Sequence, residues 1–255
     1  MARALCHRHR GIGADGVLWL HPLHQKSGDI RWQMRIYNAD GSVPEMCGNG
    51  FRCATKHLLD RDYATANDFT LFTDAGLLSA NVTSGHDDKI KTVTVDMGAP
   101  RTPVEAWQVK IADKEFSGHT VSMGNPHYVL VSDSPRTQAQ QFGMALATHP
   151  SFPDGTNVAF VNYNKDQDLM QAVIYERGVG ITQACGTGAC AGVVVGQWLN
   201  LLPRSVIQVE LPGGTLHIDV QPNHHVLMTG GVEWVFDGEI NSDDFESENH
   251  TRFDR

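Results

Sequence analysis

The chain lacks the sequence features of membrane and exported proteins. None of its apolar runs approaches the roughly 18 residues that a membrane-spanning helix requires. Residues 1–10 also lack the apolar core of a signal peptide. We therefore expect a cytoplasmic protein with no membrane partner.

Positive charge is scarce. The 255 residues include 20 Lys and Arg against 29 Asp and Glu, which gives a formal net charge of −9 at pH 7. The cationic side chains are scattered along the chain, whereas proteins that bind a phosphate backbone cluster them on one face. Nucleic acid is therefore not an expected partner.

Cysteine is sparse and irregularly spaced. An odd number of cysteines without a C-x-x-C pair, in a chain without an export signal, argues against a disulfide scaffold and against a zinc site. No G-x-G-x-x-G motif follows a predicted strand, and no P-loop or G-x-S-x-G motif occurs. We therefore expect neither a metal nor a cofactor. The five cysteines are Cys6, Cys47, Cys53, Cys185 and Cys190.

Short alternating or apolar segments separated by turn signals predict an α/β (α+β) protein. Helices are expected over residues 54–63, 137–148 and 188–201. Strands are expected over residues 17–20, 30–37, 69–73, 78–82, 91–96, 119–123, 128–131, 157–161, 170–175, 206–211, 215–220 and 232–236. The polar tail, residues 243–255, is expected to be disordered.

The two halves of the chain repeat one another. Cys47-Gly48 and Cys185-Gly186 are 138 residues apart, and several other identical residues match at the same spacing. The repeat predicts two pseudo-symmetric domains whose equivalent loops can face each other across a cleft. We expect one domain over residues 1–96 and 231–242 and the other over residues 97–230. The further matches are Ile36-Tyr37 with Ile174-Tyr175, Gly50 with Gly188, Gly76 with Gly214, and Val82 with Val220.

The repeat also predicts a gap in the first copy. Residues 123–127 form a glycine turn before a strand, and their counterpart would precede Met1. The first copy is therefore expected to lack its opening strand, which leaves the neighbouring strand edge exposed. Either the numbered chain begins downstream of the true start, or the protein has lost an edge strand.

The duplicated cysteines indicate acid–base chemistry. Cys47 and Cys185 each precede a glycine-rich turn that opens a helix, where peptide N–H groups and the helix dipole favour a thiolate. A thiolate on one face of a carbon and a thiol on the other can invert its configuration without metal or cofactor. Cys53 and Cys190 lie inside the helices and are expected to pack as small hydrophobic residues.

Residues around these cysteines are candidates for binding a substrate. The turns Gly48-Asn49-Gly50 and Gly186-Thr187-Gly188 can direct N–H groups at a carboxylate, while Asn49 or Thr187 can equally cap a helix. Glu176-Arg177 lies nine residues before Cys185, as Asn38 lies nine before Cys47, and it could form a surface ion pair instead. The other candidates, each more often structural when taken alone, are Asn125, His127 and Asn157.

At these residues the sequence resembles the diaminopimelate epimerase family. The matching motifs are long, occur in order and cover nearly the whole chain. They are Tyr37-Asn38-Ala39-Asp40-Gly41, residues 46–53, Met123-Gly124-Asn125-Pro126-His127, Thr156-Asn157-Val158, Glu176-Arg177-Gly178-Val179-Gly180 and residues 184–191.

The resemblance implies a cofactor-independent, pyridoxal-phosphate-independent isomerase that interconverts LL- and meso-diaminopimelate in lysine and peptidoglycan-precursor biosynthesis. It also implies two mixed β-barrels, each around a central helix, with the active site in the interdomain cleft, and a possible homodimer. Cys47 and Cys185 would be the catalytic thiols, helped by His127 and Glu176. Gly48, Asn49, Gly186 and Thr187 would hold the reacting carboxylate. Asn38, Asn125, Asn157, Glu176 and Arg177 would recognise the distal end of the substrate.

Three departures from the family pattern accompany the resemblance. The opening segment, which carries a substrate-contacting Asn in the family, is absent. Ile181 stands where family members usually carry Glu, and Gly16 stands where some carry Gln. Two alternatives stay open: a related racemase or isomerase of the same fold for another small amino acid, and an inactive truncated copy that binds a ligand or senses redox state.

Overall fold

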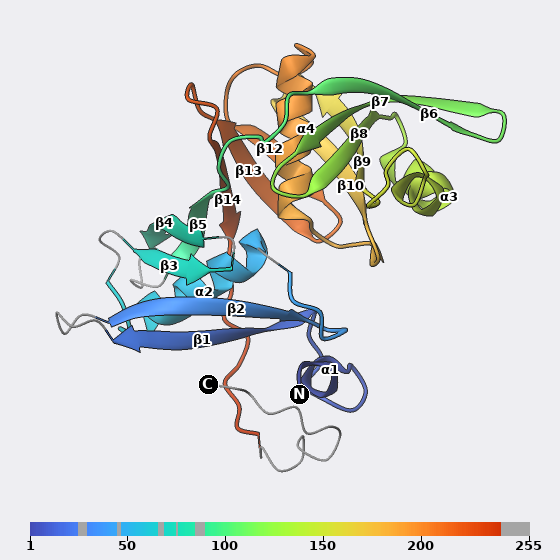
Figure 1. Ribbon diagram of the computed structural model, residues 1–255. Helices are drawn as coiled ribbons and strands as arrows, with labels where there is room; N and C mark the ends of the chain where they lie inside the picture. The colour runs from blue at the N-terminus through green and yellow to red at the C-terminus, as the bar shows by residue number, and fades with distance from the viewer. Residues whose placement is uncertain (25–29, 45–46, 66–68, 75, 85–89, 241–255) are drawn as a thin grey trace. The chain divides into compact units, whose positions relative to one another are not determined.

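The computed structural model describes residues 1–24, 30–44, 47–65, 69–74, 76–84 and 90–240. The predicted disordered tail, residues 243–255, lies outside this part of the chain. The chain folds into two compact units (Figure 1). Unit 1 comprises residues 1–79 and the chain from Val232 onward, and unit 2 comprises Ala80–Gly231.

Unit 1 is built from a small mixed sheet and a helix. β1 (Gly16–His24) and β2 (Ile30–Asn38) are antiparallel, β2 and β3 (Thr70–Thr73) are parallel, and β3 pairs with the start of β4 (Gly76–Ser84). Helix α2 (Gly48–Asp60) packs on β1 and β2 and buries Phe51, Ala54 and Leu58. A short helix α1 (Ala2–Cys6), which the sequence did not predict, precedes the sheet.

The chain after residue 231 attaches to α2 of unit 1 through side chains. The Trp234 ring stacks on His57 with 5.6 Å between centroids, and the Arg61 guanidinium lies 4.6 Å from the Trp234 centroid. Arg61 also donates to Asp237 at 2.6 Å. The predicted strand over residues 232–236 is wrong, because ring stacking and an ion pair fix this segment in place of a backbone ladder. Val235, in the same segment, is 85% exposed.

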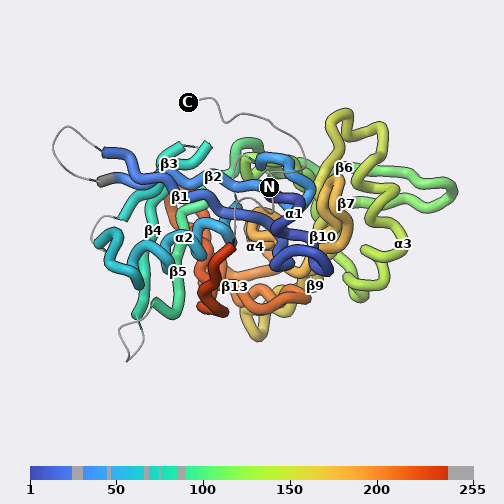
Figure 2. The backbone as a smooth tube through the Cα atoms, turned by 90° about the horizontal axis from the view of Figure 1, so that it is seen from below, coloured from blue at the N-terminus to red at the C-terminus, as the bar shows by residue number. Residues whose placement is uncertain are grey.

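Unit 2 wraps a mixed sheet around one helix (Figures 1 and 2). Helix α4 (Gly186–Trp198) packs against strands from separate parts of the sheet, so it forms the centre of the unit. The strand order is β4-β5-β14-β13-β12-β10-β9-β8-β7-β6, and β11 (Gly180–Ile181) pairs with β10. The other strands are β5 (Ile90–Asp96), β6 (Glu105–Ile111), β7 (Lys114–Ser122), β8 (Pro126–Val131), β9 (Asn157–Asn164), β10 (Leu169–Glu176), β12 (Ile207–Leu211), β13 (Gly214–Val220) and β14 (Val226–Gly231).

The composition of α4 explains its central position. The helix is rich in Gly, Ala and Val and buries ten of its residues, so it has no polar face for solvent. Helix α3 (Pro135–Ala147) instead packs outside, on β9 and β10. It turns Ala139 and Leu146 inward and leaves Met144 exposed. These features confirm the predicted α/β class with a mixed sheet around a helix.

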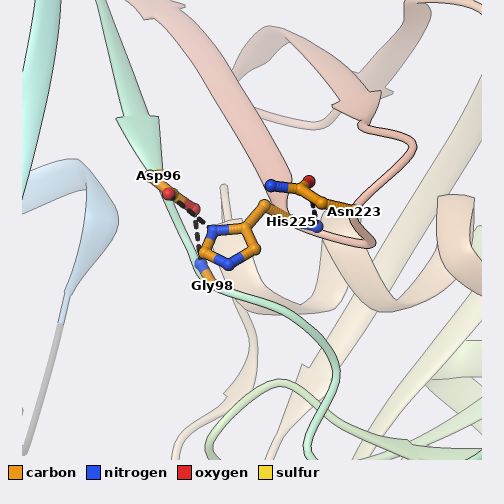
Figure 3. Close-up of polar contacts among 4 residues, drawn as sticks. All are labelled: Asp96, Gly98, Asn223 and His225. Atoms are coloured by element: carbon orange, nitrogen blue, oxygen red, sulfur yellow. Dashed lines mark hydrogen bonds and ion pairs between the residues drawn. The ribbon is translucent and has the colours of Figure 1, made fainter.

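The antiparallel pairing of β5 with β14 joins two strands of unit 2 that are far apart in sequence. At the end of this pair, His225 Nδ1 lies 2.7 Å from Asp96 Oδ2, and the Gly98 N–H donates to Asp96 Oδ1 at 2.8 Å (Figure 3). The backbone N–H of His225 in turn donates to Asn223 Oδ1 at 3.1 Å. Polar side chains therefore fix the turn that leads into the last strand.

The duplication recurs in the secondary structure. Helices α2 and α4 begin and end 138 residues apart, and the parallel pair Trp32 with Leu71 recurs as Met170 with Val209. In the described part of the chain β1 pairs only with β2, whereas its counterpart β9 pairs with both β10 and β8. The compact units divide at residue 79, so β5 belongs to unit 2; the boundary at residue 96 stays a prediction about the repeat.

Candidate active site

Each duplicated cysteine is the N-cap residue of its helix. Cys47 has φ −142° and ψ 109°, and Cys185 has φ −125° and ψ 106°, so both are extended immediately before a helical turn. The Gly50 N–H donates to Cys47 Sγ at 3.3 Å. N–H groups of the first helical turn and the positive end of the helix dipole therefore lie beside each sulfur, as the sequence predicted from the glycine turns.

The second glycine of each turn allows strand, helix and sulfur to approach closely. A Cβ at Gly188 would lie 2.7 Å from Ile174 Cγ1 and 3.3 Å from Cys185 Sγ. A Cβ at Gly50 would lie 2.8 Å from Leu18 Cδ2. Any side chain at either position would push the first helical turn away from its strand. The repeated glycine is therefore a packing requirement.

Cys185 is buried in unit 2, with 7% of its surface exposed. Burial, and next the nearby Glu176 carboxylate, raise the pKa of the Cys185 thiol to about 12. Thr187 opposes this effect, because its hydroxyl lies 3.6 Å from Cys185 Sγ. In the ligand-free protein Cys185 is therefore a thiol at neutral pH.

A chain of hydrogen bonds leads from His127 to Cys185. Asn125 Nδ2 donates to Thr187 Oγ1 at 3.2 Å, and Asn125 Oδ1 lies 2.9 Å from His127 Nε2. The Thr187 hydroxyl in turn lies 3.6 Å from Cys185 Sγ, and either of these two groups can be the donor. Three predicted site residues are thus linked to one of the two cysteines.

His127 is almost completely buried on β8, and burial lowers its pKa to about 3. It is therefore neutral at physiological pH. Its Nδ1 is buried without a hydrogen-bond partner in the described structure. An unprotonated nitrogen tolerates this better than an N–H group, so we assign the proton to Nε2, which donates to Asn125 Oδ1.

Asn157 and Arg177 are brought together by backbone contacts. The Arg177 N–H donates to Asn157 Oδ1 at 3.0 Å, and Asn157 Nδ2 donates to Pro126 O at 3.2 Å. The Arg177 guanidinium donates to the Asp154 carbonyl and is exposed. Glu176 accepts a hydrogen bond from Thr182 Oγ1 at 2.6 Å. In the described structure Glu176 and Arg177 thus form hydrogen bonds with other residues and not with each other.

Unit 1 holds the predicted site residues Asn38, Gly48 and Asn49. Asn38 ends β2 and donates to Ser42 Oγ at 2.9 Å. Gly48 is buried, and Asn49 Oδ1 is a buried acceptor without a partner in the described structure. Gly16 opens β1 opposite Asn38. A Cβ at Gly16 would lie 2.7 Å from Tyr37 O, so a longer residue there requires the backbone to shift.

The two remaining helix cysteines differ. Cys190 is fully buried, as expected of a small hydrophobic residue, but Cys53 is exposed. The prediction for Cys53 is wrong for a reason that the repeat makes visible. The counterpart of its position, Ala191, is buried because α4 is surrounded by strands, whereas α2 is covered mainly on the side that faces β1 and β2.

Sequence reasoning missed two residues that contact the candidate site, and one buried cation near it in sequence. Thr182 and Ser42 contact Glu176 and Asn38, and neither stands in a motif that signals chemistry. Arg52 is buried and was not predicted as a site residue, although it lies only five residues after Cys47.

No group of three potential metal-ligating side chains occurs in the described ranges. No helix there is long and apolar enough to cross a membrane.

Comparison with known proteins decides the family. The family model for diaminopimelate epimerase matches residues 1–103 and 119–235. The chain belongs to the diaminopimelate epimerase family. The diaminopimelate epimerase of Desulfitobacterium hafniense is 41% identical over 95% of this chain and 88% of its own length. That of Halothermothrix orenii is 39% identical over 94% of this chain and 88% of its own length.

Solved structures of low sequence identity share the fold of this family member. A probable proline racemase from Agrobacterium radiobacter K84 has a TM-score of 0.69 at 17% identity, covering 96% of this chain and 82% of that one. A hydroxyproline epimerase from Agrobacterium vitis has a TM-score of 0.64, also at 17% identity, covering 91% and 78%. At this identity the likeness concerns the fold alone.

Proposed function

We propose that this chain interconverts LL- and meso-diaminopimelate without a cofactor, using Cys47 and Cys185 as the acid–base pair. The observation that carries the proposal is the symmetric placement of the two thiols. Each is the N-cap of an equivalent helix at positions that the duplication relates. Relatives named diaminopimelate epimerase, 38–41% identical over almost the whole chain, support the substrate.

In the proposed reaction one sulfur removes the proton from the substrate α-carbon, and the other returns a proton to the opposite face. The carbanion formed between these events is stabilised by hydrogen bonds to the adjacent carboxylate. We assign those bonds to the first turns of α2 and α4, through Gly48, Asn49, Gly186 and Thr187.

The distal amino-acid end of diaminopimelate requires charged and amide partners. Arg177 can hold a carboxylate, and Glu176 can hold an ammonium group. We also assign to Glu176 a second role, beside the Cys185 thiol. Neutral His127 would orient the Asn125 amide. The residues that we assign to the distal end are Asn38, Asn125, Asn157, Glu176 and Arg177.

Deuterium exchange tests this function. Reduced protein and LL-diaminopimelate in heavy water should yield meso product labelled at the α-carbon, measured by mass spectrometry. Replacing Cys47 or Cys185 by Ala should lower turnover by about 10²–10⁴-fold, the usual contribution of a general acid or base. Cys53→Ala is the matched control, since Cys53 is exposed and outside the proposed machinery.

A panel of amino acids separates this activity from that of the structural neighbours. Exchange on proline or hydroxyproline in place of diaminopimelate would overturn the substrate assignment and leave the two-thiol mechanism. No exchange on any of them would overturn both.

We also propose that the protein acts in the cytoplasm as a homodimer, and analytical ultracentrifugation of the full chain tests the oligomeric state.

A further inference from the structure

Thr182 lies between two residues of the candidate site. It directly follows β11 and stands three residues before Cys185. Its backbone N–H donates to the Ile174 carbonyl of β10 at 3.3 Å, which continues the ladder that pairs Glu176 with Gly180. The return of the chain through β11 therefore places Thr182 beside the end of β10.

The Thr182 hydroxyl contacts the Glu176 carboxylate. Thr182 Oγ1 donates to Glu176 Oε1 at 2.6 Å, and both residues are half-buried. A Glu side chain has several rotatable bonds, whereas the β-branched Thr side chain is restricted at its first one. A charge-assisted hydrogen bond from the stiffer side chain therefore selects the orientation of the more mobile carboxylate.

The same carboxylate acts on Cys185, through its charge and through a side-chain hydrogen bond. The segment between Glu176 and the helix is also fixed on its other side, because the Gly213 N–H donates to the Gln183 carbonyl at 2.7 Å. A Cβ at Gly213 would lie 2.9 Å from the Gln183 Cβ and carbonyl oxygen, so the turn between β12 and β13 lies directly against this segment. Thr182 is therefore held in place by backbone contacts that do not involve its hydroxyl.

Unit 1 contains a similar contact made by a different position. Asn38, the counterpart of Glu176 at the 138-residue spacing, donates through Nδ2 to Ser42 Oγ at 2.9 Å. The counterpart of Thr182 is Pro44, which has no hydroxyl. In each unit a hydroxyl from the segment before the helix thus contacts the residue nine positions before the cysteine. Non-equivalent hydroxyls at equivalent targets favour orientation of that target as their role.

We propose that Thr182 is a positioning residue whose hydroxyl fixes the Glu176 carboxylate beside Cys185. This rests on the proposed function, in which Glu176 lies beside that thiol and holds the substrate ammonium group. Without the hydroxyl, a water molecule would replace the lost hydrogen bond but would not fix the direction of the carboxylate. The backbone bond from Thr182 to Ile174 would remain, so the path of the chain would be kept.

Replacing Thr182 by Val tests this role, since Val keeps the β-branched shape and removes the hydroxyl. We expect Thr182→Val to lower kcat/KM with LL-diaminopimelate by about tenfold, within the range for a hydrogen bond to a charged group. Thr182→Ser keeps the hydroxyl and should retain most of the activity. Thr215→Val, the same change at an exposed residue of β13, is the matched control and should leave the activity unchanged.

A double-mutant cycle separates orientation of Glu176 from a general structural effect. In a Glu176→Ala protein, Thr182→Val should have little further effect on kcat/KM, because no carboxylate remains to be oriented. The deuterium exchange assay measures the residual activity of these variants.

Urea unfolding of the same variants measures the contact without substrate. The double variant should have an unfolding equilibrium constant about tenfold smaller than the product of the two single effects, since one hydrogen bond to a charged group is lost only once. Combining Thr215→Val with Glu176→Ala should show no such coupling.

Wild-type activity in folded Thr182→Val protein would overturn the proposal. So would an equal loss of activity with and without the Glu176 carboxylate, or single effects on unfolding that simply multiply. If Thr182→Val does not fold, Thr182→Ala replaces it in both cycles, with Thr182→Ser as its reference. Absence of deuterium exchange in the wild type would overturn the proposed function, while the unfolding cycle would still decide whether Thr182 fixes Glu176.

Discussion

At the scale of single residues, the unit 2 part of the candidate site is a continuous line of hydrogen bonds. His127 fixes the Asn125 amide, Asn125 donates to Thr187, and the Thr187 hydroxyl contacts Cys185 Sγ. None of these groups needs to carry charge in the ligand-free protein. The line fixes the position of the Thr187 hydroxyl beside the sulfur.

Removing the Thr187 hydroxyl should weaken this line. We expect Thr187→Val to lower kcat by about tenfold, since a hydrogen bond to a charged group contributes about 1.5–3 kcal/mol and only part is lost where solvent enters. Thr187→Ser keeps the hydroxyl and is the matched control. Steady-state kinetics with LL-diaminopimelate checks this, and equal activity of the Val and Ser variants would contradict it.

Buried His127 should make stability depend on pH. Its pKa is about 3 in the folded protein and ordinary in the unfolded chain, so the unfolded chain binds the extra proton between these values. The free energy of unfolding should therefore fall as pH drops from about 6.5 toward 3, by up to about 1.4 kcal/mol per pH unit. Urea unfolding at several pH values measures this slope.

His127→Gln should flatten that slope, because Gln does not titrate. The same substitution at His217, which is exposed on β13, is the control and should leave the slope in place. A His127→Gln protein whose stability falls with pH as steeply as the wild type would show that other groups dominate.

The sequence identified the candidate acid–base residues more readily than the residues that contact the candidate site. Cys47 and Cys185 were predicted because a repeat surrounds both, and the glycine turns predicted their surroundings. The exposure of Cys53 and the partners Ser42 and Thr182 could not be predicted, because each depends on which strands cover a helix or how a loop folds back.

At the scale of elements, the start of α4 is set by contact between Gly188 and β10. Gly188→Ala would place a methyl 2.7 Å from Ile174, closer than carbon atoms pack. We expect a loss of about 1–3 kcal/mol in stability, typical of overpacking, together with a loss of activity as the Cys185 turn shifts. Gly231→Ala is the control, since only ordinary contact at 3.9 Å is met there. Denaturant unfolding and the deuterium assay measure both effects.

The attachment of the C-terminal segment to α2 is a second element-scale feature. Trp234→Ala removes the ring that His57 and Arg61 contact, and should destabilise unit 1 by about 1–2 kcal/mol from the stacking and cation–π interactions. Amide exchange in α2 should rise while that in α4 stays unchanged. Val235→Ala alters an exposed neighbour and is the control. Equal exchange in the two variants would contradict the role of Trp234.

The sequence pattern predicts some of the helices and strands better than others. Alternating segments predicted most strands, because one face of each is buried. Helices α2 and α4 begin earlier than predicted, since glycine-rich first turns have low helix propensity and are stabilised here by strand contacts. Strand β6 and strand β14 were missed, as β6 is largely exposed and β14 depends on its pairing with distant β5.

At the scale of the whole molecule, the duplication predicted two related units but not the chain path between them. Unit 2 is one continuous segment, whereas unit 1 is assembled from both ends of the sequence. A repeat in sequence contains no information on which unit the last residues join. Family membership and the α/β class were predicted and are confirmed; the assignment of site residues stays a prediction.

The attachment of Trp234 and Asp237 to α2 also bears on synthesis of the protein. The ribosome releases the residues of unit 2 before the segment that completes unit 1, so the second unit in the chain can finish folding first. Until that segment emerges, α2 lacks the partners of His57 and Arg61. The nascent chain therefore carries an unfinished N-terminal unit while unit 2 is being completed, the reverse of the usual N-to-C order of folding.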